Sequence, residues 1–167
     1  RKRYIQTSNK PISQGAKIEY ILPPSEKYIS TGKTALTDGL YGGMTFAEGW
    51  IGWEGTDGSF TIDLGSQQTF TTIQTDFLHQ LGAWILQPLS ITYYISDDGI
   101  EYKKVSSINN PEDNDPQVKF VDLTYVSDYP MLARYIKIEI EGTKTCPHWH
   151  YGVGHPCWFF IDEVVVK

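Results

Sequence analysis

The sequence predicts an all-β domain, an antiparallel β-sandwich of the jelly-roll type. About eight short runs alternate apolar and polar residues, and turn residues lie between them. No stretch of ten or more residues keeps the apolar period of a helix. Short, regularly spaced strands with turn signals between them are typical of sandwiches and jelly rolls. The length of 167 residues is that of one domain with a substantial core.

The N-terminal third is predicted to hold little regular structure. Residues 1–16 are polar and contain helix and strand breakers, so we expect a linker from a preceding domain, followed by one domain over 17–167. Residues 17–22 form the first candidate strand, which two prolines end. Residues 25–58 are rich in glycine and keep no lasting period, which predicts a long ordered loop with one helical turn near 34–37.

The remaining strands follow in order along the chain. The turn signal Asp97-Asp98-Gly99 separates two of them. Residues 107–116 contain Asn, Pro and Asp in a cluster and are expected to form an exposed loop. The alternation of apolar and polar residues predicts strands at 60–64, 70–77, 89–95, 102–105, 118–126, 134–141 and 158–166.

The charge balance excludes two classes of partner. The formal net charge is −6 and the pI is about 5.1, whereas nucleic acids and anionic membranes are bound by basic surfaces. No apolar run approaches the ~20 residues of a membrane-spanning helix. We therefore expect neither a nucleic-acid partner nor a membrane partner.

The sequence contains none of the common catalytic motifs. There is no Gly-x-Ser-x-Gly, no His-Glu-x-x-His and no phosphate-binding loop. Paired acids such as Asp97-Asp98, and Asp113 with Asp115, lie in turn-like segments rather than in a recognisable cleft. We expect a binding module and not an enzyme.

Two features bear on the compartment. The chain starts at Arg1 without an initiator Met or a hydrophobic signal core, which indicates a cut end. Its two cysteines flank one short loop, and disulfides favour oxidising compartments. The expected location is extracellular, at a cell surface or in a periplasm.

The segment from Cys146 to Cys157 is dense in reactive and aromatic residues, including His148, His150 and His155. A disulfide between the two cysteines is the first interpretation, and closing a loop of this size would contribute about 3 kcal/mol in the entropic model. Free buried thiols are the second interpretation. A zinc site is the third, because three His and two Cys could supply a tetrahedral set, although the spacing fits no standard zinc motif.

Several stretches in order resemble the discoidin family, also called coagulation factor 5/8 type C domains. The resemblance covers roughly residues 17–167. The matching stretches are Ala35-Leu36-Thr37-Asp38-Gly39, Trp50-Ile51-Gly52-Trp53-Glu54-Gly55, Thr61-Ile62-Asp63-Leu64-Gly65, Ser96-Asp97-Asp98-Gly99, Ala133-Arg134-Tyr135-Ile136-Lys137-Ile138 and Phe160-Ile161-Asp162-Glu163-Val164.

The resemblance implies a galactose-binding-like jelly roll that binds sugar through loops at one end of the sandwich. Bacterial members are grouped with carbohydrate-binding module family 32. The stretch from Cys146 to Gly152 resembles the C-terminal module of chitobiases from Bacteroides relatives. The implied function is a non-catalytic module that tethers a bacterial glycosidase, of the chitobiase or hexosaminidase kind, to glycans. Its partners would then be a glycan and the catalytic domain of the same chain.

The resemblance also implies a structural calcium ion between the loop after residue 34 and the last strand. Carried over to this sequence, the carboxylates are Asp38 and Glu163, and the carbonyls come from Ala35, Leu40, Gly43 and Asp162. Calcium prefers oxygen ligands, which backbone carbonyls can supply. In the alternative interpretation, Asp38 only caps a turn and Glu163 lies at a solvent-facing edge.

We predict the sugar site on the loops 50–55, 79–84 and 147–155, which carry aromatic rings, His and amides. In this family, galactose-specific members usually carry an Arg and an Asn in this region, and the loop 79–84 has neither. The predicted ligand is therefore a glycan that contains either galactose or N-acetylhexosamine. Two alternatives stay open, an adhesion module and a spacer without ligand. The predicted contacts are Trp53, Glu54, His79, Gln80, Trp84, His148, Trp149, His150 and Tyr151.

Overall fold

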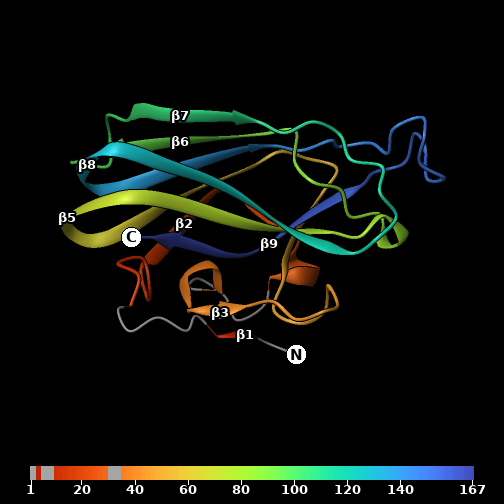
Figure 1. Cartoon of the computed structure of the whole chain (residues 1–167), viewed down its shortest axis with the longest axis horizontal. Coiled ribbons are helices and arrows are strands. Elements are labelled where there is room, and N and C mark those ends of the chain that lie inside the picture. Colours follow the sequence, from red (N-terminus) through yellow and green to blue (C-terminus); the bar gives the residue numbers. More distant parts are fainter. Residues whose placement is uncertain (1–2, 5–9, 30–34) are drawn as a thin grey trace.

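The computed structural model describes residues 3–4, 10–29 and 35–167, which form a two-sheet antiparallel sandwich (Figure 1). Three short 3-10 helices accompany the strands: η1 (Glu26–Tyr28), η2 (Ala35–Thr37) and η3 (Leu81–Ala83). The strands are β1 (Arg3–Tyr4), β2 (Lys17–Leu22), β3 (Leu40–Tyr41), β4 (Ile51–Glu54), β5 (Gly58–His79), β6 (Ser90–Ser96), β7 (Lys103–Asn109), β8 (Lys119–Glu141) and β9 (Trp158–Val166).

The two long strands β5 and β8 pair antiparallel and run through both sheets. Their register shifts between Asp63 and Gln68 and again between Phe70 and Thr72, and the ribbon bends there. Residues 58–63 of β5 belong to a sheet with β2, β8, β6 and β7, which we call the open sheet. Residues 72–79 of β5 belong to a sheet with β8, β9 and β4, which we call the covered sheet.

The core lies between the inner faces of these sheets. Trp53, Phe60, Phe77 and Tyr93 are fully buried there, and the rings of Trp53 and Phe159 stack 5.0 Å apart. The Tyr93 hydroxyl lies at 2.8 Å from both the Thr75 Oγ1 and the Leu123 carbonyl. Alternating apolar residues with these few satisfied polar groups explain why the strands close into a sandwich.

A third layer lies over the outer face of the covered sheet. Figure 1 shows β1, β3 and η2 beneath β9, and β9 is buried on both faces from Phe159 to Val166. Residues 10–16 belong to this domain, because Ile12 donates its N–H to the Val166 carbonyl and the Ser13 side chain is 1% exposed. The prediction of a linker over 1–16 is therefore wrong for 10–16. Its remainder, apart from Arg3–Tyr4 in β1, lies outside the described residues.

The structure confirms the predicted all-β class, with three differences in detail. The predicted strands 60–64 and 70–77 are one continuous strand, β5, and the strands 118–126 and 134–141 are joined in β8. Strand β4 lies inside the predicted loop 25–58, and residues 107–109 belong to β7 rather than to a loop. Over the described ranges, no helix combines the length and apolarity that crossing a membrane requires.

Candidate functional site

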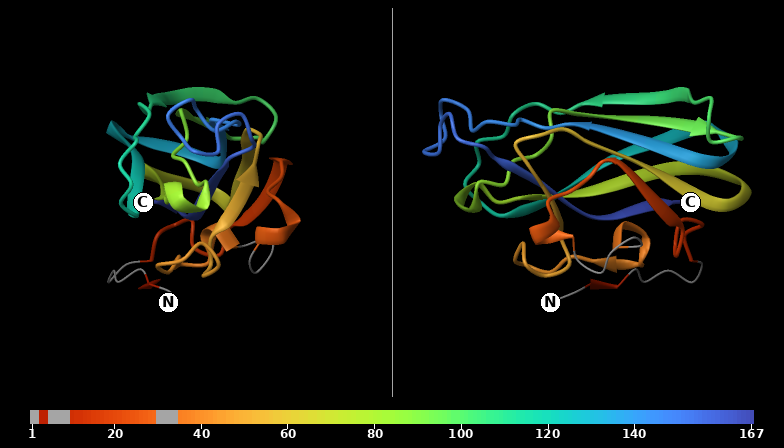
Figure 2. Two further views of the ribbon diagram at one scale, coloured as in Figure 1. Left: turned by 90° about the vertical axis from the view of Figure 1, so that its right-hand side faces the viewer. Right: turned by 180° about the vertical axis from the view of Figure 1, so that it is seen from behind.

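Three loops that are distant in sequence meet at one end of the sandwich, which we call the loop end. They are the β5–β6 loop with η3, the β7–β8 loop and the β8–β9 loop (Figure 2). In Figure 2 the 81–83 turn and the tip of the β8–β9 loop project from the same end. Antiparallel pairing accounts for this, because His79 at the end of β5 pairs with Lys119 at the start of β8, and Ser90 at the start of β6 pairs with Glu141 at the end of β8.

His150 and Tyr151 hold the β8–β9 loop against η3. The His150 Nδ1 accepts from the Gly152 N–H at 2.9 Å, so the ring proton lies on Nε2 and is donated to the Leu81 carbonyl at 2.8 Å. The Tyr151 hydroxyl donates to the Gly82 carbonyl at 2.7 Å. His150 is 4% exposed and both its nitrogens are engaged, so the prediction that it contacts a sugar is wrong. It positions the loop instead.

Trp84 provides an aromatic ring beside this contact. Its backbone has φ 65°, a left-handed conformation that costs energy for a bulky residue. The conformation is held because the Trp158 N–H donates to the Trp84 carbonyl and the ring packs 5.8 Å from Tyr151 and 5.9 Å from His155. The half-buried Trp84 and the 69% exposed Tyr151 thus form an aromatic surface at the loop end.

The β7–β8 loop joins this surface through Glu112. The Glu112 carboxylate accepts a hydrogen bond from the Trp149 indole N–H at 3.0 Å. Trp149 is half-buried, so one part of its ring stays accessible. Glu112 was not predicted from the sequence, because a lone acid in a polar loop carries no distinguishing signal, whereas His155 lies within the predicted loop 147–155.

His79 lies beneath the β7–β8 loop rather than at the surface. Its side chain is fully buried, and its Nε2 is 2.7 Å from the Asp115 carbonyl. The Gln87 amide donates to Nδ1 at 3.0 Å and also to Asp113 at 3.1 Å. The predicted sugar contact at His79 is therefore wrong, and the residue fixes the loop that carries Glu112.

The remaining predicted contacts divide by exposure. Trp53 is wrong as a contact, because it is fully buried and its indole N–H donates to the Leu22 carbonyl at 2.9 Å. Glu54 is exposed and pairs with Trp158 in the β4–β9 register, at the border of the loop end. Gln80 is half-buried and His148 is exposed.

A second aromatic group borders the loop end and was missed by sequence reasoning. Tyr28 lies 5.4 Å from Trp158 and 5.6 Å from Phe46 between ring centroids, and all three are partly buried. Trp158 connects this group to the β5–β6 loop through a bridge with Ile85. Tyr28 and Phe46 fall in the aperiodic segment 25–58, where position in the fold could not be predicted.

The two cysteines are free thiols and not a disulfide. Both are buried at the base of the β8–β9 loop, and their side chains are hydrogen-bonded to each other. Burial, aided by the neighbouring Cys146, raises the pKa of the Cys157 thiol to about 12. The predicted disulfide is thus replaced by the second interpretation. The zinc interpretation fails too, since no metal-binding group of three or more His, Cys, Asp and Glu occurs in the described part of the chain.

Asp38 and Glu163 meet where the calcium ion was predicted. A bulge in β9 sets Asp162 and Glu163 opposite the single residue Asp76. Glu163 is 1% exposed and accepts from the Gly39 N–H at 2.7 Å, so it does not lie at a solvent-facing edge. The Asp38 carboxyl is hydrogen-bonded to Glu163 and also accepts from the Leu40 N–H at 2.9 Å.

The chemistry of this pair fits a divalent cation. The Glu163 Oε1 is buried without a hydrogen-bond partner among the described residues. Burial, together with the charges of Asp38 and Asp162, raises the pKa of Glu163 to about 10. A bound cation would remove both costs. Of the predicted carbonyl ligands, that of Gly43 already accepts from the Trp50 indole at 3.0 Å, which leaves one lone pair.

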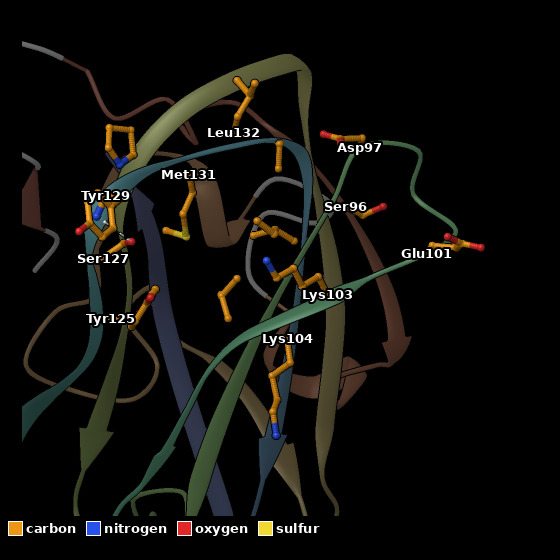
Figure 3. Close-up of a pocket in the computed structure, with 14 residues that line it drawn as sticks. Ser96, Asp97, Glu101, Lys103, Lys104, Tyr125, Ser127, Tyr129, Met131 and Leu132 are labelled. Atoms are coloured by element: carbon orange, nitrogen blue, oxygen red, sulfur yellow. Dashed lines mark hydrogen bonds between the residues drawn. The ribbon is translucent and has the colours of Figure 1, made fainter.

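A cavity of about 600 Å³ lies at the opposite end of the sandwich. Figure 3 shows it between Tyr125, Ser127 and Tyr129 of β8 and the β6–β7 turn. It shares no residue with the three loops of the loop end. It therefore does not contribute to the predicted sugar site.

Comparison with known proteins follows this geometry. Among solved structures with the same fold is a Clostridium perfringens module, CpGH89CBM32-5, in complex with GalNAc-β-1,3-galactose, at 16% identity and a TM-score of 0.57 over 93% of this chain and 98% of that one. The chitosan-binding module 1 of a Paenibacillus sp. IK-5 chitosanase/glucanase has 15% identity and a TM-score of 0.60 over 95% of this chain and 99% of that one. The family 32 carbohydrate-binding module of Streptococcus pneumoniae EndoD has 15% identity and a TM-score of 0.60 over 94% of this chain and 98% of that one.

No curated protein matches the sequence. The model of the F5/8 type C domain matches residues 23–154, which is most of the chain. This chain belongs to the F5/8 type C domain family.

Proposed function

We propose that this domain is a non-catalytic carbohydrate-binding module whose glycan site is the aromatic surface of the loop end. The observation that carries the proposal is that three loops meet here: Trp84 of the β5–β6 loop packs against Tyr151 of the β8–β9 loop, and Trp149 of that same loop donates to Glu112 of the β7–β8 loop. An exposed ring offers its face to the C–H groups of a sugar, and the carboxylate accepts hydrogen bonds from hydroxyls. The similar modules that bind a GalNAc-galactose disaccharide and chitosan support a glycan ligand.

The proposed parent is a bacterial glycosidase of the chitobiase or hexosaminidase kind, acting outside the cytoplasm. An open surface with one or two rings binds weakly, in the millimolar to high-micromolar range, roughly −4 to −6 kcal/mol. Tethering makes such affinity useful, because it raises the effective concentration of substrate near a catalytic domain of the same chain.

Calcium is the cofactor of this proposal, with a structural role. Asp38 and Glu163 would hold the ion together with carbonyls of Ala35, Leu40, Gly43 and Asp162. The ion would tie η2 and β3 to β9, which anchors the covering layer rather than the sugar.

Titration of the domain with GalNAc-β-1,3-galactose and with N,N′-diacetylchitobiose, followed by nuclear magnetic resonance, tests the site. Tyr151→Ala is expected to weaken binding about tenfold, the loss of roughly one stacked ring. Tyr151→Phe keeps the ring but loses the hydrogen bond to the Gly82 carbonyl, so it should bind more tightly than Tyr151→Ala. Tyr129→Ala, at a tyrosine that is 80% exposed at the opposite end, is the matched control.

If Tyr151→Ala and Trp84→Ala both bind like the parent while another surface responds to sugar, the loop end is not the site. If neither disaccharide nor a wider glycan array shows binding, the domain is a spacer or an adhesion module.

A further inference from the structure

A small acidic pocket lies on the outer face of the open sheet, apart from the aromatic surface of the loop end. We call it the sheet pocket. Its volume is about 280 Å³, close to the lower limit for ligand sites and suited to one sugar ring. Its polar lining comes from Asp57, Ser59, Ser90, Thr92, Glu139 and Glu141.

The strand register places these side chains together. Glu139 lies directly opposite Ser59 on β5 and opposite Thr92 on β6, and Glu141 lies opposite Ser90. Residues directly opposite each other in antiparallel strands share a face of the sheet. The pocket is thus built on three rigid strands rather than on loops.

Ser59 contributes a polar group that the protein leaves unused. The residue is 4% exposed, and its hydroxyl has no hydrogen-bond partner within the described residues. A buried hydroxyl without a partner is costly. Because Ser59 lines the sheet pocket, a ligand that enters the pocket can relieve this cost.

The charges in the pocket are unbalanced. Asp57 is paired with Lys144 at 2.9 Å, whereas no salt bridge joins Glu139 or Glu141 to a cation in the described ranges. The two glutamates lie on one face of β8, roughly 7 Å apart along the strand. The nearby cation of β8, Lys137, is engaged instead with the rings of Tyr94 and Tyr102, whose centroids lie 4.4 and 4.8 Å from its ammonium group.

We infer that the sheet pocket binds the protonated amine of an amino sugar, the chemistry of a glucosamine unit. An ammonium group can donate charge-assisted hydrogen bonds to Glu139 and Glu141, and the ring hydroxyls can bond with Ser59 and Ser90. The inference rests on the proposed carbohydrate binding and adds a second, charge-selective site to it.

The test compares the fully deacetylated glucosamine disaccharide with N,N′-diacetylchitobiose at pH 6, using amide chemical shifts of the intact domain. The deacetylated sugar should shift residues 58–59, 90–92 and 139–141. The double variant Glu139→Gln/Glu141→Gln should weaken its binding about tenfold and leave the acetylated sugar unaffected. Glu101→Gln, an exposed glutamate in the β6–β7 turn, is the matched control.

Ser59→Ala distinguishes a binding role from a structural one. It should weaken the deacetylated sugar about threefold while the melting temperature stays equal or rises, because it removes an unsatisfied hydroxyl. Shifts confined to the loop end, or a double variant that binds like the parent, would overturn the inference. If the acetylated sugar does not bind but the deacetylated sugar does, the result counts against the loop-end site and supports the sheet pocket.

Discussion

The carboxylates on the outer faces of the two sheets differ in burial. On the covered sheet, Asp76, Asp162 and Glu163 are at most 4% exposed beneath the layer that contains β3. On the open sheet, Glu139 and Glu141 face solvent, and Asp63 forms a two-point ion pair with Arg134 at 2.8 and 3.0 Å. The charged form of the same residue types is therefore costly on the covered sheet and not on the open sheet, because burial penalises the charged form and solvent does not.

The comparison suggests a different role for each group of acids, a structural cation site on the covered sheet and a ligand-binding face on the open sheet, both of which are proposals. A buried carboxylate is retained as an ion only if something compensates its charge. We therefore expect a structural ion at Asp38 and Glu163, whereas Glu139 and Glu141 face solvent, with Glu139 accepting from the Tyr94 hydroxyl at 2.6 Å, and are open to exchangeable ligands.

The largest expected effect is that of calcium on the covered sheet. At a calcium concentration 100 times the dissociation constant, binding to the folded state adds about 2.7 kcal/mol to the free energy of unfolding. For a domain of this size the melting temperature should rise by roughly 5–10 °C relative to a chelator. Differential scanning calorimetry with and without calcium measures it.

The variant Glu163→Gln tests the calcium prediction further, because its effect on stability should have opposite signs with and without calcium. With chelator the variant should be at least as stable as the parent, because an amide has no charge to bury. With calcium it should be less stable, because a ligand is lost. Glu19→Gln, on the exposed face of β2, is the control and should respond like the parent. Equal melting temperatures with calcium and with chelator in the parent would argue against the ion.

The second effect concerns Asp76. Burial, a hydrogen bond with Asp122 and the charge of Asp162 raise the pKa of Asp76 to about 9. In the unfolded chain an aspartate has a pKa of about 3.9. The folded state thus holds the proton more tightly, so this contribution is complete below about pH 4 and is lost as the pH rises toward 9.

Asp76→Asn mimics the protonated acid and should remove this pH dependence. Its amide can still accept from Gln74, which donates to Asp76 Oδ1 at 3.0 Å, and can donate to Asp122. Urea denaturation at fixed calcium should find the variant more stable than the parent by roughly 2 kcal/mol at pH 8 and similar at pH 4. Asp128→Asn, at an exposed position in the bend of β8, should show no such difference.

The smallest effect is expected on the open sheet and has the opposite sign. The hydrogen bonds from Arg134 lower the pKa of Asp63. Its contribution is therefore present above the unfolded pKa and is lost as the pH falls through the folded pKa. Because the pair is partly exposed, Asp63→Asn should cost less than about 1 kcal/mol at pH 7, and the cost should shrink as the pH falls. A larger loss at acid pH than at neutral pH would contradict the comparison.

Strand positions could be predicted from the sequence because burial leaves a period of two. Residues 89–95 and 134–141 alternate in this way, and both lie in strands of the open sheet. Strand β4 was missed because Trp53 and its neighbours are buried on both faces and so leave no alternation. Strands β5 and β8 were each predicted as two strands because the apolar alternation stops at the bend, where the register of the pair also shifts.

The candidate site was harder to predict than the fold. Residue type alone placed His79 and Trp53 among sugar contacts, but His and Trp serve as well in buried networks and stacked cores as on a surface. Trp84 and Tyr151 were among the predicted contacts, although for Trp84 core packing was the favoured alternative. Their partner Glu112 could not, because only the folded chain brings the β7–β8 loop beside Trp149.

The bent ribbon of β5 and β8 also constrains the order in which the chain can assemble. His79 pairs with Lys119 at the start of the ribbon, and Gly58 pairs with Ile140 at its far end, with all other pairs nested between them. Loop closure is least costly for the innermost pair, so zippering is favoured from His79 outward through the bend. Strand β6 docks on the far half of β8, and its innermost pair, Ser96 with Tyr135, closes a loop of similar length. Such nested, long-range pairing places refolding in the slow regime of small β proteins, on the order of milliseconds to seconds.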